Sequence, residues 1–158
     1  ISTIGARGRN REPGNGSDDV DNLGNAKLVA EAKKAKVAQF VLVSSKGTSN
    51  ADANPMDFMR PILQAKLKGE NAVRESGVPY TIVQPGGLLD DAGGKVAVAF
   101  SAKDSGFGRI PRDDVATVCV EALGRKSALG KSVSIVSGSG PWPNNWDKEF
   151  KAIKADRR

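Results

Sequence analysis

The sequence predicts an α/β protein in which helices cover a mainly parallel sheet. Segments with the pattern of strands alternate with segments of helical periodicity along most of the chain. The runs FVLVSS and YTIVQ are apolar and rich in β-branched residues, which is typical of parallel strands buried on both faces. In such sheets ligands bind beyond the carboxyl ends of the strands, so the residues that follow the strands are the candidate site.

The first half of the chain supplies two strands and two helices. Residues 1–5 have the pattern of a buried strand, and the glycine-, asparagine- and arginine-rich residues 6–17 that of a loop. Residues 18–37 place apolar side chains at helical spacing, with acidic residues first and lysines last, as the helix dipole favours. Residues 38–45 form the next strand, which ends in Ser44 and Ser45. Residues 57–76 form the second helix, with Pro61 near its start.

The second half begins with a strand at residues 79–84 that runs into Pro85, Gly86 and Gly87. Glycines at a strand end let the backbone come close to a ligand. Residues 94–100 and 107–110 predict a small hairpin over the site. Residues 111–126 predict a helix, residues 131–137 the last strand and residues 144–155 a terminal helix. Gly5, Ser44 and Gly86 then follow three strands and meet at one edge of the sheet.

Composition excludes several kinds of site. The 158 residues include no histidine, so His-based catalytic triads and His metal sites are excluded, and no metal is predicted. The single cysteine, Cys119, lies on an apolar helical face and is interpreted as a core thiol. No apolar run is long enough to predict a membrane span.

The net charge of +6 is concentrated in two basic segments. Their residues are Arg7, Arg9, Arg11, Lys148, Lys151, Lys154, Arg157 and Arg158. We interpret them as a solvated loop and the end of a terminal helix; docking onto an acidic protein, phosphate or membrane surface is the alternative. Because no known nucleic-acid-binding motif or aromatic stacking platform accompanies the charge, no nucleic-acid partner is predicted.

Three segments, taken in order, resemble a known family. They are residues 20–48, residues 65–90 (AKLKGENAVRESGVPYTIVQPGGLLD) and residues 110–123 (IPRDDVATVCVEAL). Together they are similar to the NmrA-like branch of the atypical short-chain dehydrogenase/reductase superfamily, which includes the NAD(P)-binding subunit of the chloroplast inner-envelope translocon. The resemblance covers residues 1–137 and implies a Rossmann-like fold that binds NADP or NAD. It leaves the compartment open between chloroplast and cytoplasm.

The resemblance also identifies what the sequence lacks. In this family a glycine-rich GxxGxxG loop binds the dinucleotide pyrophosphate at a helix N-terminus, and no such loop precedes residues 1–6. Residues 1–140 therefore correspond to the later strands and helices of the domain, and residues 141–158 to a basic terminal helix and tail. Ile1 is not an initiator methionine, and we expect the true beginning to lie upstream. Cofactor binding would require that upstream portion, and either it or a partner protein would cover the sheet edge.

The resemblance implies cofactor contacts at the ends of three strands and at one helix lysine. These residues are Gly5, Ala6, Ser44, Ser45, Lys66, Pro85, Gly86, Gly87 and Leu88. Most of them have a structural alternative, which for Gly5 and Ala6 is close packing. Gly86 and Gly87 could instead form a turn with unusual backbone angles, Ser44 and Ser45 could cap a strand, and Lys66 could be a surface lysine.

Catalysis of the usual kind is not predicted. Reductases of the superfamily use a Tyr-x-x-x-Lys pair, in which the lysine lowers the tyrosine pKa and the tyrosine moves a proton. With Lys66 as the lysine, the tyrosine position holds Ile62; with Lys68 it holds Gln64. Tyr80, the one tyrosine, begins a strand and is interpreted as packing. Ser45 and Lys66 are therefore remnants of a catalytic set. We expect a redox sensor or a weak, non-classical oxidoreductase, or alternatively a non-catalytic assembly subunit of a larger complex.

Three further pairs of residues have structural interpretations. Asp21 and Asn25 are expected at a helix start and on the surface. Arg112 and Asp114 are expected to form a helix cap and a local ion pair. Trp142 and Trp146 are expected to hold the last helix against the body, with anchoring of a partner as the alternative.

Overall fold

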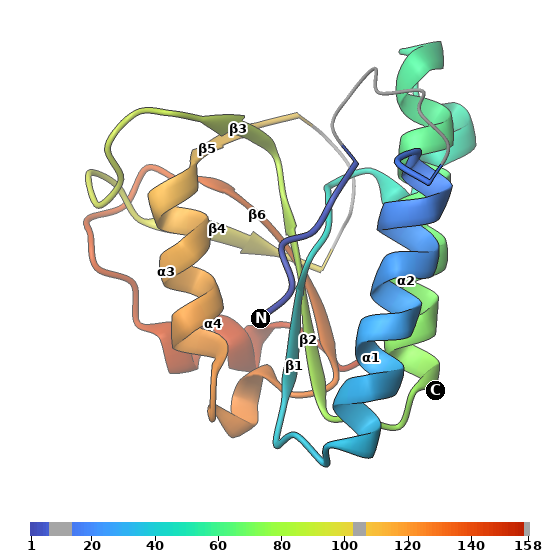
Figure 1. Ribbon diagram of the computed structural model, residues 1–158. Coiled ribbons are helices and arrows are strands. Elements are labelled where there is room, and N and C mark those ends of the chain that lie inside the picture. The colour runs from blue at the N-terminus through green and yellow to red at the C-terminus, as the bar shows by residue number, and fades with distance from the viewer. Residues whose placement is uncertain (7–13, 103–106, 157–158) are drawn as a thin grey trace.

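A four-stranded sheet forms the centre of the molecule (Figure 1). The computed structural model describes residues 1–6, 14–102 and 107–156. The strand order is β1 (Phe40–Val43), β2 (Tyr80–Pro85), β6 (Lys131–Ser137) and β4 (Val98–Ser101). β1, β2 and β6 are parallel, and β4 pairs with β6 in the antiparallel sense. The predicted parallel α/β fold is confirmed.

The segment 1–5 pairs along the free edge of β1, but as a single bridge. Ser2 is the parallel partner of Leu42, and its N–H and C=O bond Val41 and Val43 at 2.7 and 2.9 Å. The predicted strand is therefore shorter than expected, although its direction is the expected one. The side chains of Ile1 and Ile4 are 57% and 36% exposed, so this edge keeps an apolar surface.

Two helical layers cover the sheet (Figure 1). On one face lie α1 (Asn25–Lys34), which continues the π-helical segment η1 (Asp18–Gly24), and α2 (Arg60–Glu75), which continues η3 (Asp57–Met59). On the other face lie α3 (Arg112–Ala122) and α4 (Trp146–Ala152). Two short 3-10 segments, η2 (Thr48–Ala53) and η4 (Lys126–Ala128), complete the helical structure of the described residues.

Successive side chains of a strand point to opposite faces of the sheet, and the sheet therefore separates two hydrophobic cores. In β1, Val41 packs into the cluster that contains α3 and α4 side chains, whereas its neighbours Phe40 and Leu42 pack into the cluster of α1 and α2. In β2, Val83 and Ile82 divide between the two clusters in the same way, so β1 and β2 are buried on both faces, as their continuous apolar runs predicted.

The predicted hairpin of residues 94–100 and 107–110 is wrong. β4 joins the edge of the main sheet, while β5 (Arg109–Pro111) pairs in parallel with β3 (Gly87–Leu89). The reason is a close backbone contact: a Cβ on Gly86 would lie 2.4 Å from the Gly108 carbonyl oxygen, and Gly87 N–H donates to that oxygen at 2.9 Å. Glycines at 86 and 108 thus allow β5 to add to β3 instead of β4.

The last helix is held against the body by aromatic contacts, as predicted. The rings of Trp142 and Trp146 meet edge to face at 5.5 Å, and Trp146 lies 6.4 Å from Phe100. Both tryptophans pack against the cluster that contains the fully buried Phe150. Cys119 belongs to the same cluster, and burial raises the pKa of its thiol to about 11, which confirms a core thiol. None of the helices in the described ranges has the length and apolarity needed to cross a bilayer.

Candidate functional site

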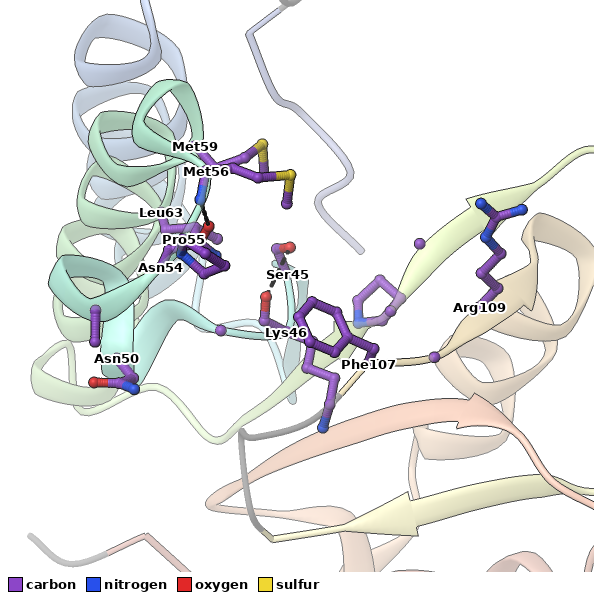
Figure 2. Close-up of a pocket in the computed structure, with 16 residues that line it drawn as sticks. Ser45, Lys46, Asn50, Asn54, Pro55, Met56, Met59, Leu63, Phe107 and Arg109 are labelled. Atoms are coloured by element: carbon purple, nitrogen blue, oxygen red, sulfur yellow. Dashed lines mark hydrogen bonds between the residues drawn. The ribbon is translucent and has the colours of Figure 1, made fainter.

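A pocket of about 800 Å³ opens at the carboxyl ends of β1 and β2 (Figure 2). Four of the predicted site residues line it: Ser45, Pro85, Gly86 and Gly87. The opposite wall comes from residues 53–63, which include the start of α2, and a third side comes from Phe107, Gly108 and Arg109. The loop that follows β2 therefore faces an open pocket at the sheet edge where ligands of parallel sheets bind.

Gly86 and Gly87 are glycines for different reasons. Neither has a positive φ, so the alternative of a turn with unusual backbone angles is wrong. Position 86 must be a glycine because the Gly108 carbonyl oxygen leaves no room for a Cβ there. A Cβ on Gly87 would make only an ordinary contact, 3.4 Å from Cγ of Arg109. Gly87 is exposed to the pocket, so its backbone can contact a bound molecule. Leu88, in β3, is 42% exposed and does not line the pocket.

A second group of predicted residues gathers around Asp21. Its carboxylate accepts from Lys66 Nζ at 2.7 Å and from the N–H of Ala6 at 3.1 Å. A Cβ on Gly5 would lie 3.5 Å from the same Nζ. Because Ser2 pairs with Leu42 in parallel, Gly5 lies beyond the same end of the sheet as Ser45. Gly5, Ala6 and Lys66 thus share one polar cluster at the predicted edge.

Asp21 and Asn25 are buried, so their assignment to the surface is wrong. They are 2% and 3% exposed, and Asn25 accepts from Ser2 Oγ at 2.7 Å. Gly69 explains the burial: a Cβ there would lie 2.2 Å from the Asp21 carbonyl oxygen, so its absence lets η1 pack directly on α2. The wide turns of η1 were not visible in a pattern read at ordinary α-helical spacing.

The two candidates for the lysine of the Tyr-x-x-x-Lys pair, Lys66 and Lys68, have different surroundings. Lys66 points to Asp21 and is 19% exposed in its side chain, whereas Lys68 is 61% exposed and bonds Asp18. The Lys68 hydrogen bond holds the pKa of Asp18 below its ordinary value. Tyr80 lies at the opposite end of β2 from Pro85, and its hydroxyl donates to Asp156 at 3.0 Å. In either register, then, no tyrosine hydroxyl stands at the pocket.

Sequence reasoning missed a buried carboxylate behind the pocket. Glu70 is fully buried and accepts from Ser44 Oγ at 2.5 Å, Thr48 Oγ1 at 3.0 Å and Gln84 Nε2 at 3.0 Å. Its other oxygen accepts from Arg74 at 2.7 Å. Ser44 therefore faces this network, and Ser45 faces the pocket. A glutamine inside the apolar run YTIVQ was the available signal, because a buried amide needs polar partners.

The predicted ion pair between Arg112 and Asp114 is wrong. Arg112 Nε bonds Asp90 at 2.7 Å, and Asp114, which is 2% exposed, accepts from the N–H of Gly94 at 2.7 Å. The start of α3 closes onto the loop that follows β3, so both side chains serve that contact.

The basic segments are only partly described. Arg7, Arg9, Arg11, Arg157 and Arg158 lie outside the described residues. Lys148, Lys151 and Lys154 are exposed, and Lys151 pairs with Asp147 one turn earlier.

The pocket and the Asp21 cluster fit one end of a dinucleotide. The exposed Gly87 backbone and the Ser45 hydroxyl suit an amide-bearing ring. Beside Gly5, the ammonium of Lys66 has three N–H donors and Asp21 takes one, which suits a ribose. The sequence has no glycine-rich loop for the pyrophosphate. The residues present therefore fit the nicotinamide and its ribose.

Comparison with known proteins gives the family. Residues 1–126 match a family model described as NAD(P)H-binding. The chain is 38% identical over 144 residues to sanguinarine reductase of Eschscholzia californica, which covers 86% of this chain and 51% of that protein. It is 38% identical over 90 residues to the chloroplastic protein TIC 62 of Pisum sativum, covering 56% of this chain and 17% of that protein.

A solved structure agrees. A Bacillus halodurans protein provisionally described as an NAD-dependent epimerase/dehydratase superposes with a TM-score of 0.76 at 32% identity, covering 90% of this chain and 66% of that one. The chain spans only part of its curated relatives: 43% of a chloroplastic Arabidopsis thaliana protein, 51% of the reductase and 17% of TIC 62. The family match and the parallel strand order agree, and this chain belongs to the NmrA-like NAD(P)H-binding family of Rossmann-fold proteins.

Proposed function

We propose that this chain supplies the nicotinamide-side half of an NAD(P)-binding protein that acts as a redox sensor or a non-classical oxidoreductase. The observation that supports this most is the pocket at the ends of β1 and β2, lined by Ser45, Pro85, Gly86 and Gly87. Its position is the one in which parallel α/β sheets bind dinucleotides.

Different residues of this chain would bind the ribose and the nicotinamide ring. Lys66, held by Asp21 beside Gly5, would donate to the ribose hydroxyls. The exposed backbone of Gly87 and the hydroxyl of Ser45 would contact the nicotinamide. When bound, the nicotinamide supplies hydride chemistry. The pyrophosphate would be held by a glycine-rich segment outside this sequence, as family membership implies.

The lack of a tyrosine at the position of the usual Tyr-x-x-x-Lys pair favours sensing or slow turnover. Ile62 is half-buried, Gln64 donates its amide to Asp52 at 2.6 Å, and Tyr80 is bound at the far end of its strand. A reduction that needs a proton at the substrate oxygen lacks the usual tyrosine donor here, and such proton transfer is worth roughly 10²–10⁴ in rate.

A second function, that of a non-catalytic assembly subunit, is favoured by the sheet edge. Ile1, Ile4 and Leu23 are 57%, 36% and 46% exposed, and within the described ranges no strand pairs with the outer side of residues 1–5. An open edge of this kind invites another strand. An upstream part of the same chain or a partner protein would cover it.

The test uses the full natural polypeptide that contains this chain. Native mass spectrometry would detect bound nucleotide, and titration would compare NADPH with NADH. To remove the lysine without leaving a buried charge, Lys66→Met is combined with Asp21→Asn; Lys68→Met, on the exposed face of the same helix, is the matched control. We expect roughly ten-fold weaker nucleotide binding in the double variant and none of this loss in the control.

Two outcomes would count against the proposal. An equal loss of nucleotide affinity in the double variant and in Lys68→Met would show that Lys66 does not bind the ribose. No binding of either nucleotide, together with stable co-purification in a larger particle, would favour the assembly subunit.

A further inference from the structure

The pocket has a wall that the dinucleotide does not account for. Met56 and Met59, at the two ends of η3 just before α2, approach it from one side, and Phe107, just before β5, from the other (Figure 2). Phe107 is 89% exposed and Met56 is 44% exposed. Single exposed apolar side chains are common on protein surfaces, whereas a cluster of large ones at the mouth of one pocket indicates a surface that binds a ligand.

Among the described residues, the charged side chains that line the same pocket have one sign. Lys46 and Arg109 line it, and none of its lining residues in the described ranges is acidic. The side chain of Arg109 is exposed, and no hydrogen bond or ion pair joins it to the rest of the described chain. Its stem passes over Gly87, since a Cβ there would lie 3.4 Å from Arg109 Cγ. The guanidinium is therefore carried at the rim beside the loop that would meet the nicotinamide.

We propose that this pocket admits a small, flat, apolar organic anion as the molecule whose redox state the protein reads or changes. This inference rests on the proposed function, because it places the anion beside the nicotinamide end. The rings of the ligand would lie against the methionines and Phe107, and its single anionic group would pair with Arg109. A guanidinium forms paired hydrogen bonds with a carboxylate or sulfonate, and these are strengthened where apolar walls exclude water.

The test uses two fluorescent probes that share a ring system and differ in charge. One is 1-anilinonaphthalene-8-sulfonate, an anion; the other is the uncharged N-phenyl-1-naphthylamine. Both are titrated into the full natural polypeptide. In Arg109→Gln we expect roughly ten-fold weaker binding of the anionic probe and unchanged binding of the neutral one. Arg109→Lys keeps the charge but loses the paired hydrogen bonds, so it should weaken the anionic probe by less than Arg109→Gln does. Phe107→Ser should weaken both probes.

Arg112→Gln is the matched control. Arg112 is an exposed arginine three residues along, it pairs with Asp90, and it does not line the pocket. It should change neither titration. Because Arg109 and Phe107 are exposed, neither replacement removes a core contact, and equal unfolding temperatures would establish that each variant is folded.

The outcomes separate this inference from the proposed function. If Arg109→Gln leaves the anionic probe unaffected, or weakens both probes equally, the inference is overturned, whatever the protein does with NADPH. If the probes behave as expected and no nucleotide binds, the anion site is upheld and the proposed function fails.

Discussion

Replacing Glu70 by glutamine tests whether the buried network supports the sheet edge that carries the pocket. Glu70 is fully buried, and its two oxygens accept from four groups: Ser44, Thr48, Gln84 and Arg74. Glutamine has the same shape but only one accepting oxygen. Its amide N–H₂ would face a donor on one side, so at least one buried donor loses its partner.

The magnitude follows from the contacts that remain. Breaking a buried ion pair costs roughly 3–5 kcal/mol. Arg74 is 24% exposed and keeps hydrogen bonds to Asn71 and Ser132 as well as the ion pair with Asp156. The loss should therefore be near the lower limit, about 3 kcal/mol. For a domain of this size that corresponds to a fall of about 6–12 °C in unfolding temperature.

Thermal unfolding of the full natural polypeptide, followed by circular dichroism and calorimetry, measures this loss. Glu75→Gln is the control, because Glu75 is exposed on the same helix; its effect should stay within about 0.5 kcal/mol. Combining Glu70→Gln with Arg74→Met should cost less than the sum of the two single changes. An unfolding temperature for Glu70→Gln within about 1 °C of the unmodified protein would refute this account of the network.

Three further predictions concern packing and titration. Because burial raises the pKa of the Cys119 thiol from 9.0 to about 11, its alkylation at pH 8 should be slow until urea unfolds the protein, and fast alkylation of the native protein would contradict this. The free energy of unfolding should not depend on this thiol below pH 9, and it should fall as the pH rises from 9 through 11. Gly86→Ala should destabilise by about 1–3 kcal/mol in urea titrations, since its Cβ meets the Gly108 carbonyl, while Gly87→Ala should change stability by less than about 0.5 kcal/mol. Trp146→Ala should cost about 3 kcal/mol through lost aromatic contacts, and a chevron or urea curve that superposes on the unmodified one would exclude that role.

The layers of the fold were predictable because a strand that is buried on both faces is a continuous apolar run in the sequence. FVLV and YTIVQ could hardly be anything other than central strands, and they pair in parallel with Phe40 opposite Tyr80. The placement of 94–111 was not predictable, because it depends on a glycine–glycine backbone contact between positions 86 and 108 that no local pattern encodes.

The candidate site was predictable by position and less so by side-chain direction. Strand ends identify Ser44 and Ser45 together, but pleating turns one into the network of Glu70 and the other to the pocket. Asp21 was misplaced because its burial depends on Gly69 in another helix. The apolar wall at Met59 and Phe107 was not predicted, since those residues come from segments far apart in the chain.

The carboxylate of Asp156 has a practical consequence for labelling. It accepts from the N–H and hydroxyl of Ser132 and from the hydroxyl of Tyr80, so residue 156 is held where β2 and β6 begin (Figure 1). The pocket opens at the other end of β2, beyond Pro85. A fluorophore or affinity handle attached at the exposed Lys154 would therefore sit a full strand length from the pocket, and immobilising the molecule through it should leave the pocket entrance unobstructed.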